Sequence, residues 1–270
     1  MSDIFFKEFY NNVKDPSWPS DVENYCDFIK LPEAIKQECF DVHGLESRLQ
    51  QIESADYWTS IISSDTVYQY DRLVFLPVPK CGYVYYRTLF SKLGWKKITF
   101  DQVDFDQHIV FSSIMHPLSR YLKGLTEWVW INNLFPKSRA PDDQKYFFKL
   151  MSNVLLTDNH TLPYTVVYKN VIDKINWIPS DNLTDNETKQ AMMNLFKKYH
   201  YDISLPMDDP RSHESGPDKL KIYQTIKQIY KNKKLDESNI LHIYMMFAND
   251  LKFYRQLVDN FDPTWTARRT

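Results

Sequence analysis

The middle of the chain alternates short apolar runs with segments of helical periodicity. Residues 73–78 are apolar, β-branched or aromatic and stop at Pro79, which is typical of a buried strand that ends in a loop. Residues 85–93 then place apolar side chains at helical spacing, and Gly94 provides a stop at the C-terminal end. This pattern predicts a strand, a loop and a helix in succession.

Further strands and a series of helices come next. The pattern predicts strands over residues 96–100 and 108–115, and then a helix over 118–132. Helical signals dominate the rest of the chain, in the segments 142–155, 185–199, 218–230 and 236–258. Buried strands interleaved with helices predict an α/β fold, with a mostly parallel central sheet flanked by helices.

Residues 1–70 differ from the rest of the chain, because their pattern is helical and irregular. Candidate helices cover residues 33–40 and 45–62, and neither carries a group of side chains that indicates chemistry. We therefore expect a helical N-terminal extension over 1–70 and one α/β domain over 71–270.

The composition describes a soluble globular chain without an excess of charge. Lysine plus arginine (33) nearly balance aspartate plus glutamate (35), which leaves a net charge of −2. Nucleic-acid and membrane partners are therefore not expected. The first residues are too acidic for a signal peptide, and no apolar run approaches the roughly 18 residues of a membrane span. Three cysteines without a C-x-x-C pair and scattered histidines predict a cytoplasmic protein with neither disulfides nor a metal. The oligomeric state stays open.

Glycine is scarce, and its scarcity excludes several classes of site. The chain has five glycines in 270 residues, against a typical usage of about 7%. No G-x-G-x-x-G, G-x-x-x-x-G-K-[ST] or G-x-S-x-G motif occurs. These absences disfavour classical dinucleotide binding, a Walker-type nucleotide site and a nucleophile-elbow hydrolase.

The loop Pro79-Lys-Cys-Gly82 has the composition of an anion-binding turn. It comes after a buried strand, so we expect it at the carboxyl edge of the sheet, where open α/β sheets bind ligands. The first turn of the next helix leaves backbone N–H groups available to a phosphate or sulfonate. Gly82 lets an anion approach the backbone, and Lys80 adds a mobile positive charge. A plain strand-to-helix turn with a solvated lysine is the other interpretation.

A second segment repeats this arrangement. Its strand runs into His116-Pro-Leu-Ser-Arg-Tyr121 at the start of a helix. Together with Pro79-Lys-Cys-Gly82, it resembles the sulfotransferase family, and most closely the carbohydrate-type and phage-encoded branches. The resemblance covers about residues 71–258, with weaker similarity at 160–163, 180–183 and 247–254.

In that family the first loop holds the 5′-phosphosulfate of 3′-phosphoadenosine 5′-phosphosulfate, and the second holds its 3′-phosphate. The resemblance implies a P-loop-like sulfotransferase architecture. It also implies transfer of a sulfonate group from this nucleotide donor to a hydroxyl of a glycan or small molecule. Lys80 would be catalytic, because it would stabilise the leaving bridging oxygen and the sulfonate.

The resemblance assigns donor binding to Lys80, Cys81, Gly82, Tyr83, Val84, Tyr85, Met115, Arg120 and Lys123. Three of these depart from the family pattern. Val84 replaces a threonine, Met115 an arginine and Lys123 a serine. Two side chains that would grip the 3′-phosphate are thus absent, and Arg120 and Lys123 are the cations that could replace them.

Transfer also requires a base for the acceptor hydroxyl. We choose His108, at the start of the third predicted strand, with Asp104 and Asp106 as alternatives; an ordinary strand-edge histidine is the competing interpretation. His160 and His213 are further candidates. Trp128 and Trp130 could line a sugar cleft, and the lysines of residues 219–234 are expected on a solvated helix face.

Two other functions compete with sulfonate transfer. The departures at Val84, Met115 and Lys123 allow a degenerate member of the family that binds or serves a structural role without catalysis. A nucleotide or polyphosphate kinase is a third hypothesis. It is disfavoured because the chain lacks a Walker lysine-serine pair and an evident acidic Mg²⁺ ligand.

Overall fold

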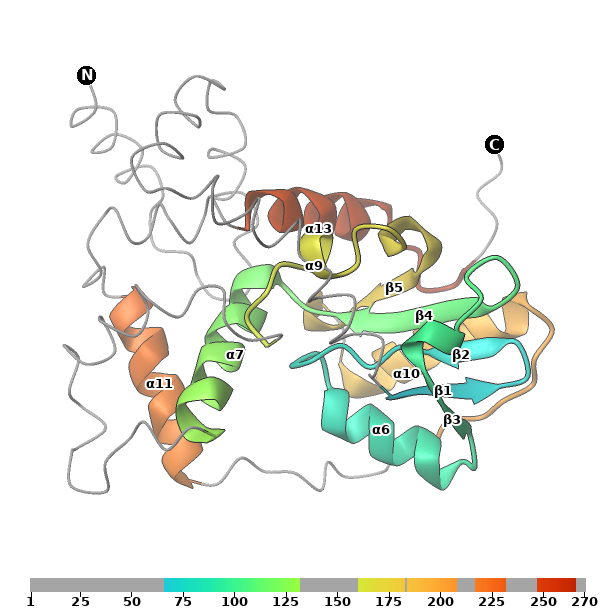
Figure 1. The fold of residues 1–270 in the computed structure, drawn as a ribbon, viewed down its shortest axis with the longest axis horizontal. Coiled ribbons are helices and arrows are strands. Elements are labelled where there is room, and N and C mark those ends of the chain that lie inside the picture. The colour runs from blue at the N-terminus through green and yellow to red at the C-terminus, as the bar shows by residue number, and fades with distance from the viewer. Residues whose placement is uncertain (1–65, 132–159, 183, 208–216, 232–246, 266–270) are drawn as a thin grey trace, which may run out of the picture. The chain divides into compact units, whose positions relative to one another are not determined.

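The computed structural model describes residues 66–131, 160–182, 184–207, 217–231 and 247–265 (Figure 1). They divide into two compact units. The sheet unit contains the described residues of 56–116, 168–214 and 254–270, and the helical unit contains those of 117–167 and 215–253. The expected helices over 33–40, 45–62 and 142–155 lie outside the described residues.

The sheet unit is built on an open five-stranded mixed sheet with the strand order β3-β1-β2-β4-β5. Its strands are β1 (Thr66–Tyr70), β2 (Leu73–Phe75), β3 (Lys96–Thr99), β4 (Ile109–Ile114) and β5 (Asn176–Pro179). β2, β4 and β5 run parallel, whereas β1 is antiparallel to both β2 and β3. The α/β class is therefore confirmed.

The expectation of a mostly parallel sheet is wrong in the half that contains β1. Residues 66–70 fall in the expected helical extension, but they form a strand that pairs Tyr70 with Leu73 across a tight turn. Asp71 in that turn has a φ of 52°, which reverses the chain within two residues. The expected domain boundary at residue 71 thus falls inside a β-hairpin.

The described helices are α6 (Tyr83–Lys92), α7 (Pro117–Ile131), α9 (Tyr164–Val167), α10 (Asp185–Lys198), α11 (Pro217–Lys231) and α13 (Ala248–Asn260), with short 3₁₀ turns η1 (Phe100–Gln102), η2 (Ile172–Lys174) and η3 (Ser180–Asn182). Except for α9, which was not expected, each described helix corresponds to an expected one. Residues 236–246 of the expected helix 236–258 lie outside the described residues. The start of α10 shows how hydrogen bonds between neighbouring residues set the end of a helix. Thr184 accepts a hydrogen bond from the amide of Glu187, and the Glu187 carboxylate accepts one from the amide of Thr184.

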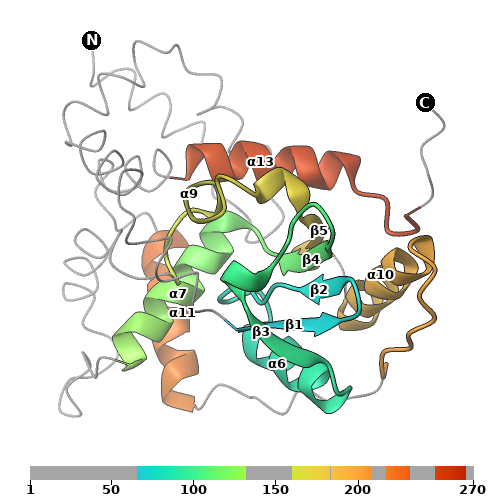
Figure 2. The same cartoon turned by 45° about the vertical axis from the view of Figure 1, so that its right-hand side comes forward.

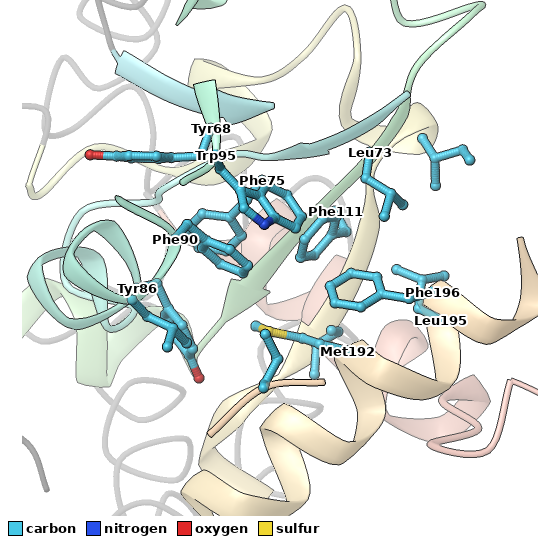
Figure 3. Packing of buried hydrophobic residues seen from close by; sticks show 14 of the residues in the cluster. Tyr68, Leu73, Phe75, Tyr86, Phe90, Trp95, Phe111, Met192, Leu195 and Phe196 are labelled. Atoms are coloured by element: carbon cyan, nitrogen blue, oxygen red, sulfur yellow. The ribbon is translucent and has the colours of Figure 1, made fainter. Parts of the chain in front are cut away.

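One face of the sheet packs against α6 and α10 through an aromatic core (Figure 3). Phe111 of β4 lies at its centre, with ring centroids 5.5 Å from Phe75, 5.9 Å from Phe90 and 5.1 Å from Phe196. The core-facing residues alternate along each strand with residues of the other face, as the pleat requires. This packing fixes α6, and therefore the loop that precedes it, against β2 and β4.

In the helical unit, α7 and α11 lie side by side (Figures 1 and 2). Gly124 in the middle of α7 permits a close approach, because a Cβ there would collide with the carbonyl group of His160. Asp250 of α13 accepts hydrogen bonds from the amides of Tyr164 (2.6 Å) and Thr165 (2.8 Å) and from the Thr165 hydroxyl (2.6 Å). This buried carboxylate caps α9. Asp250 therefore has a structural role, and its presence in segment 247–254 does not require a catalytic one.

Candidate functional site

Both predicted anion loops start from one edge of the sheet. β2 and β4 are parallel neighbours, with Phe75 opposite Phe111. The amide of Leu76 donates to the carbonyl of Phe111 at 2.9 Å, which extends the pairing one residue beyond β2. The loop after β2 and the turn after β4 therefore emerge together at the carboxyl edge, the place where an open α/β sheet binds ligands.

The loop before α6 carries two residues with positive φ. Lys80 has a φ of 69° and Gly82 a φ of 77°, on either side of buried Cys81. A lysine in this region of φ is uncommon, so its conformation is imposed by the surrounding structure. Lys80 itself is partly exposed at the loop. This backbone shape places a cation at the turn that leads into a helix.

Gly82 is the N-cap of α6 in the left-handed conformation. Tyr86 donates the first intrahelical hydrogen bond, to the carbonyl of Gly82 at 2.9 Å, so the amides of residues 83–85 form the first turn that precedes it. Amides at a helix N-terminus favour an anion, because the helix dipole is positive there. The first loop therefore has the backbone geometry of an anion cradle.

Two buried serines of β4 hold this loop in place. The Ser112 hydroxyl donates to the carbonyl of Leu76 and the Ser113 hydroxyl to the carbonyl of Cys81, each at 2.5 Å. Both serines are fully buried, so each hydroxyl must find a protein acceptor. Neither serine was predicted to have a role, although two hydroxyls within an otherwise apolar buried strand indicate that each needs an acceptor.

The aromatic side chains that come after Gly82 have partners on the helices. The Tyr83 hydroxyl accepts a hydrogen bond from Arg87 at 3.1 Å, and Lys189 lies over the ring of Tyr85 at 5.3 Å. Val84 is 49% exposed. These residues would serve a donor through their amides, so the missing threonine hydroxyl at Val84 does not alter the cradle itself.

The turn after β4 lacks a charged side chain for a second anion. Met115 is buried and apolar, and the next residue, His116, is buried as well. Burial lowers the pKa of His116 to about 3, so its imidazole is neutral at physiological pH. Neither residue replaces the arginine that the family places at the end of this strand.

A carboxylate occupies this turn instead. The amide of His116 donates to Oδ2 of Asp181, and the Tyr254 hydroxyl donates to the same oxygen at 3.4 Å. Burial and the neighbouring Asp181 raise the pKa of Tyr254, which keeps its hydroxyl protonated as a donor. Asp181 lies in the segment 180–183 that sequence analysis singled out, but its role depends on the adjacency of β4 and β5.

Arg120 and Lys123 belong to the helical unit, whereas the loop belongs to the sheet unit. Arg120 is 1% exposed; it donates through Nη1 to the carbonyl of Leu162, and its guanidinium lies 4.5 Å from the ring centroid of Tyr164. Lys123 is partly buried on α7. The contacts of Arg120 give it a structural role in its own unit, and its expected contact with the 3′-phosphate stays a prediction.

His108 does not lie near the loop. It precedes β4, at the amino end of a strand whose carboxyl end leads to His116, so β4 separates it from Lys80. Its Nδ1 accepts the amide of Asp104 at 3.0 Å, which fixes the ring at the opposite edge of the sheet. The structure therefore corrects the choice of His108 as base, together with its neighbours Asp104 and Asp106. His213 lies outside the described residues.

Comparisons of the chain with protein-family models, curated proteins and solved structures found no match. Among the described residues, no helix has the length and apolar character needed to cross a bilayer. Within the same residues, no group of three or more histidine, cysteine, aspartate or glutamate side chains could hold a metal ion.

Substitution of Gly82 tests the rigidity of the loop. A Cβ at residue 82 would lie 2.7 Å from Cε2 of Tyr86, and the ring of Tyr86 is itself packed 5.4 Å from Phe75. Gly94 is the matched control, since its φ of 76° is nearly the same and nothing lies within 4 Å of an added Cβ. We expect Gly94→Ala to lower the free energy of unfolding by about 1 kcal/mol, and Gly82→Ala by roughly 1–2 kcal/mol more. Urea denaturation measures both, and equal losses would contradict the tight packing of Tyr86 under the loop.

Burial of His116 predicts an acid-sensitive fold. Because its pKa is lower in the folded state, the unfolded chain binds the proton first, and stability is lost as the pH falls below the ordinary value of 6.5 towards about 3. We expect this group to remove about 2 kcal/mol of the free energy of unfolding between pH 7 and pH 5. His116→Gln, which is neutral throughout, should decline by about that much less over the same range. Identical pH profiles for the two proteins would show that His116 is not buried in its neutral form.

Proposed function

We propose that the protein transfers a sulfonate group from 3′-phosphoadenosine 5′-phosphosulfate to a hydroxyl of a glycan or small molecule. The observation that carries the proposal is the placement of the loop 79–82 at the carboxyl end of β2, next to the parallel strand β4. The P-loop-like sulfotransferase architecture is part of the same proposal. It is supported by the order strand, loop and helix at β2 and α6, and by the neighbouring turn after β4.

The residues of the first loop fit the phosphosulfate end of the donor. The amides at the start of α6 would bind its oxygens, and Lys80 would neutralise charge on the bridging oxygen as it leaves. The Ser113 hydroxyl keeps the carbonyl of Cys81 turned away from the anion, because that carbonyl accepts its hydrogen bond. An anion would therefore meet N–H groups and not a carbonyl oxygen.

The reaction would be an in-line displacement at sulfur. The acceptor oxygen forms a bond to sulfur while the bond from sulfur to the bridging oxygen breaks, and the electron pair remains on the 5′-phosphate of the nucleotide. The proton of the acceptor hydroxyl passes to a base. Positioning and charge stabilisation provide the rest of the catalysis.

The fit to the 3′-phosphate end of the donor is weaker. Met115 and His116 provide no charge at the end of β4, and Asp181 already accepts the amide of His116. A carboxylate repels a phosphate at the same position. The described sheet unit thus supports only the phosphosulfate half of the donor site.

This asymmetry favours a second candidate function. A protein with the same loop and no competent 3′-phosphate site could bind an anionic ligand without transferring a group. Asp181 at the turn after β4 is the observation that supports this alternative. Sulfonate transfer requires binding of the nucleotide donor and the positive charge of Lys80, whereas binding without transfer does not require both.

Replacement of Lys80 tests the transfer. We expect Lys80→Ala to lower the rate of transfer of labelled sulfate by at least about a hundredfold, because the leaving oxygen loses its positive partner. Lys96→Ala is the matched control, since it removes an equal charge from an exposed position of β3. Circular dichroism checks that both variants fold. Undiminished transfer by Lys80→Ala would refute the assignment.

Calorimetry with the product nucleotide separates the two functions. Sulfonate transfer predicts that 3′-phosphoadenosine 5′-phosphate binds with a Kd below about 100 μM, or −5.5 kcal/mol. Because the turn after β4 offers no cation, we expect removal of the 3′-phosphate to weaken binding by no more than about threefold. Absence of binding by either nucleotide would favour the non-catalytic alternative. A loss of about a hundredfold without the 3′-phosphate would contradict a donor site that is built only around the first loop.

A further inference from the structure

The outer face of α6 carries a row of polar and cationic side chains. Tyr86, Leu89 and Phe90 face the core. The opposite face presents residues at intervals of three and four, which places them next to one another along the helix. These residues are Val84, Arg87, Thr88, Ser91 and Lys92.

This face borders an open pocket of about 510 Å³ at the edge of the sheet. β1 contributes Tyr68 to the pocket and β3 contributes Lys97. Tyr68 and Lys97 are directly paired across the antiparallel strands, so their side chains project from the same face of the sheet, towards α6. The pocket therefore joins a helix face to a sheet edge within one unit.

Two tyrosines orient Arg87 in the wall of this pocket. Its Nε donates to the Tyr68 hydroxyl at 3.5 Å and its Nη1 to the Tyr83 hydroxyl at 3.1 Å. Its guanidinium carbon lies 4.9 Å from the ring centroid of Tyr83. All of these partners are neutral, so the guanidinium is oriented without being neutralised. An oriented guanidinium loses less entropy when it binds an oxyanion.

The lining has cations and no carboxylate. Arg87 and Lys97 contribute positive charge, although the whole chain has a net charge of −2. Within the part of the chain that the structure describes, Arg87 and Lys97 form no ion pair. The positive potential is therefore local to this pocket and does not reflect a basic surface in general.

The remaining lining suits a small anionic group attached to a larger ligand. Ser91 provides a hydroxyl from α6, and Thr88 uses its own hydroxyl to donate to the carbonyl of Val84 at 3.0 Å. Val84, which is 49% exposed, offers an apolar surface at the end of the pocket nearest the start of α6. A guanidinium and an ammonium beside a hydroxyl donor, here that of Ser91, are groups that bind tetrahedral oxyanions.

We propose that this pocket binds the sulfate or phosphate monoester group of a ligand, with Arg87 and Lys97 as its two principal contacts. Lys80 does not line the pocket, so the site is distinct from the loop before α6. The proposal therefore does not depend on sulfonate transfer. A solvated helix face with scattered lysines would attract anions only by general electrostatics, so that the loss of any exposed lysine would weaken the attraction equally.

Titration calorimetry of the full chain at constant ionic strength tests the proposal. The probes are inorganic sulfate, inorganic phosphate, glucose 6-sulfate, glucose 6-phosphate and, as the uncharged reference, glucose. We expect the charged probes to bind and glucose not to bind. Tighter binding of glucose 6-sulfate or of glucose 6-phosphate shows whether the pocket prefers a sulfate or a phosphate monoester. Failure of every anion to bind overturns the proposal.

Variants place the binding in the pocket. Lys97→Gln and Arg87→Gln should each weaken binding of the preferred ester by about tenfold. Lys96→Gln is the matched control, because Lys96 is the adjacent exposed lysine of β3, pairs with Gln69 and projects from the opposite face of the sheet. We expect it to bind the ester as the wild type does.

Two outcomes would place the anion elsewhere and overturn the proposal. Equal weakening by Lys96→Gln and Lys97→Gln would indicate general electrostatic attraction, and loss in Lys80→Ala with retention in Lys97→Gln would indicate the loop. If Arg87→Gln fails to fold because Tyr68 and Tyr83 lose their partner, Lys97→Gln alone decides, since its side chain is exposed. Transfer of labelled sulfate by Lys97→Gln at the wild-type rate would show that this pocket is separate from the site of the proposed activity.

Discussion

The hydrogen bonds from β4 to the loop carbonyls are the constraint on which the candidate site depends. Ser112 and Ser113 fix Leu76 and Cys81, and through them the positions of Lys80 and Gly82. Because both hydroxyls are fully buried, the carbonyls that they bind cannot turn towards solvent without leaving a donor unsatisfied. The conformation of the loop is therefore determined by the neighbouring strand as much as by its own sequence.

The elements of the sheet unit were predictable where the local signal was strong. Apolar, β-branched runs predict the strands within residues 73–78 and 108–115, and Gly94 predicts the end of α6. The strand β1 was missed, because residues 66–70 mix polar and apolar side chains and acquire strand structure by pairing on both sides. Long-range pairing of this kind overrides a weak local pattern.

The chemistry of the site was only partly predictable for the same reason. Lys80 and Gly82 lie in a contiguous motif, so their sequence spacing gives their geometry. His108 was chosen because it lies between the two loops in sequence, at the start of a predicted strand, but the two ends of β4 lie at opposite edges of the sheet. Asp181 acts from the end of β5, and nothing in one sequence indicates that β5 pairs with β4. Sequence spacing therefore predicts the arrangement of residues within one loop, but it does not predict which residues of other elements lie beside that loop.

The ring of Tyr86 belongs both to the aromatic core and to the floor beneath Gly82. A disturbance of the core therefore reaches the backbone of the loop through one side chain, without a mobile hinge between them. Ligand-binding competence and the folded core should form a single cooperative unit, so that the loop has no separate melting transition of its own. Evolution of the loop would then be limited by the same packing that stabilises the fold. A change of ligand would be easier to achieve on the solvated face of α6 than at the turn itself.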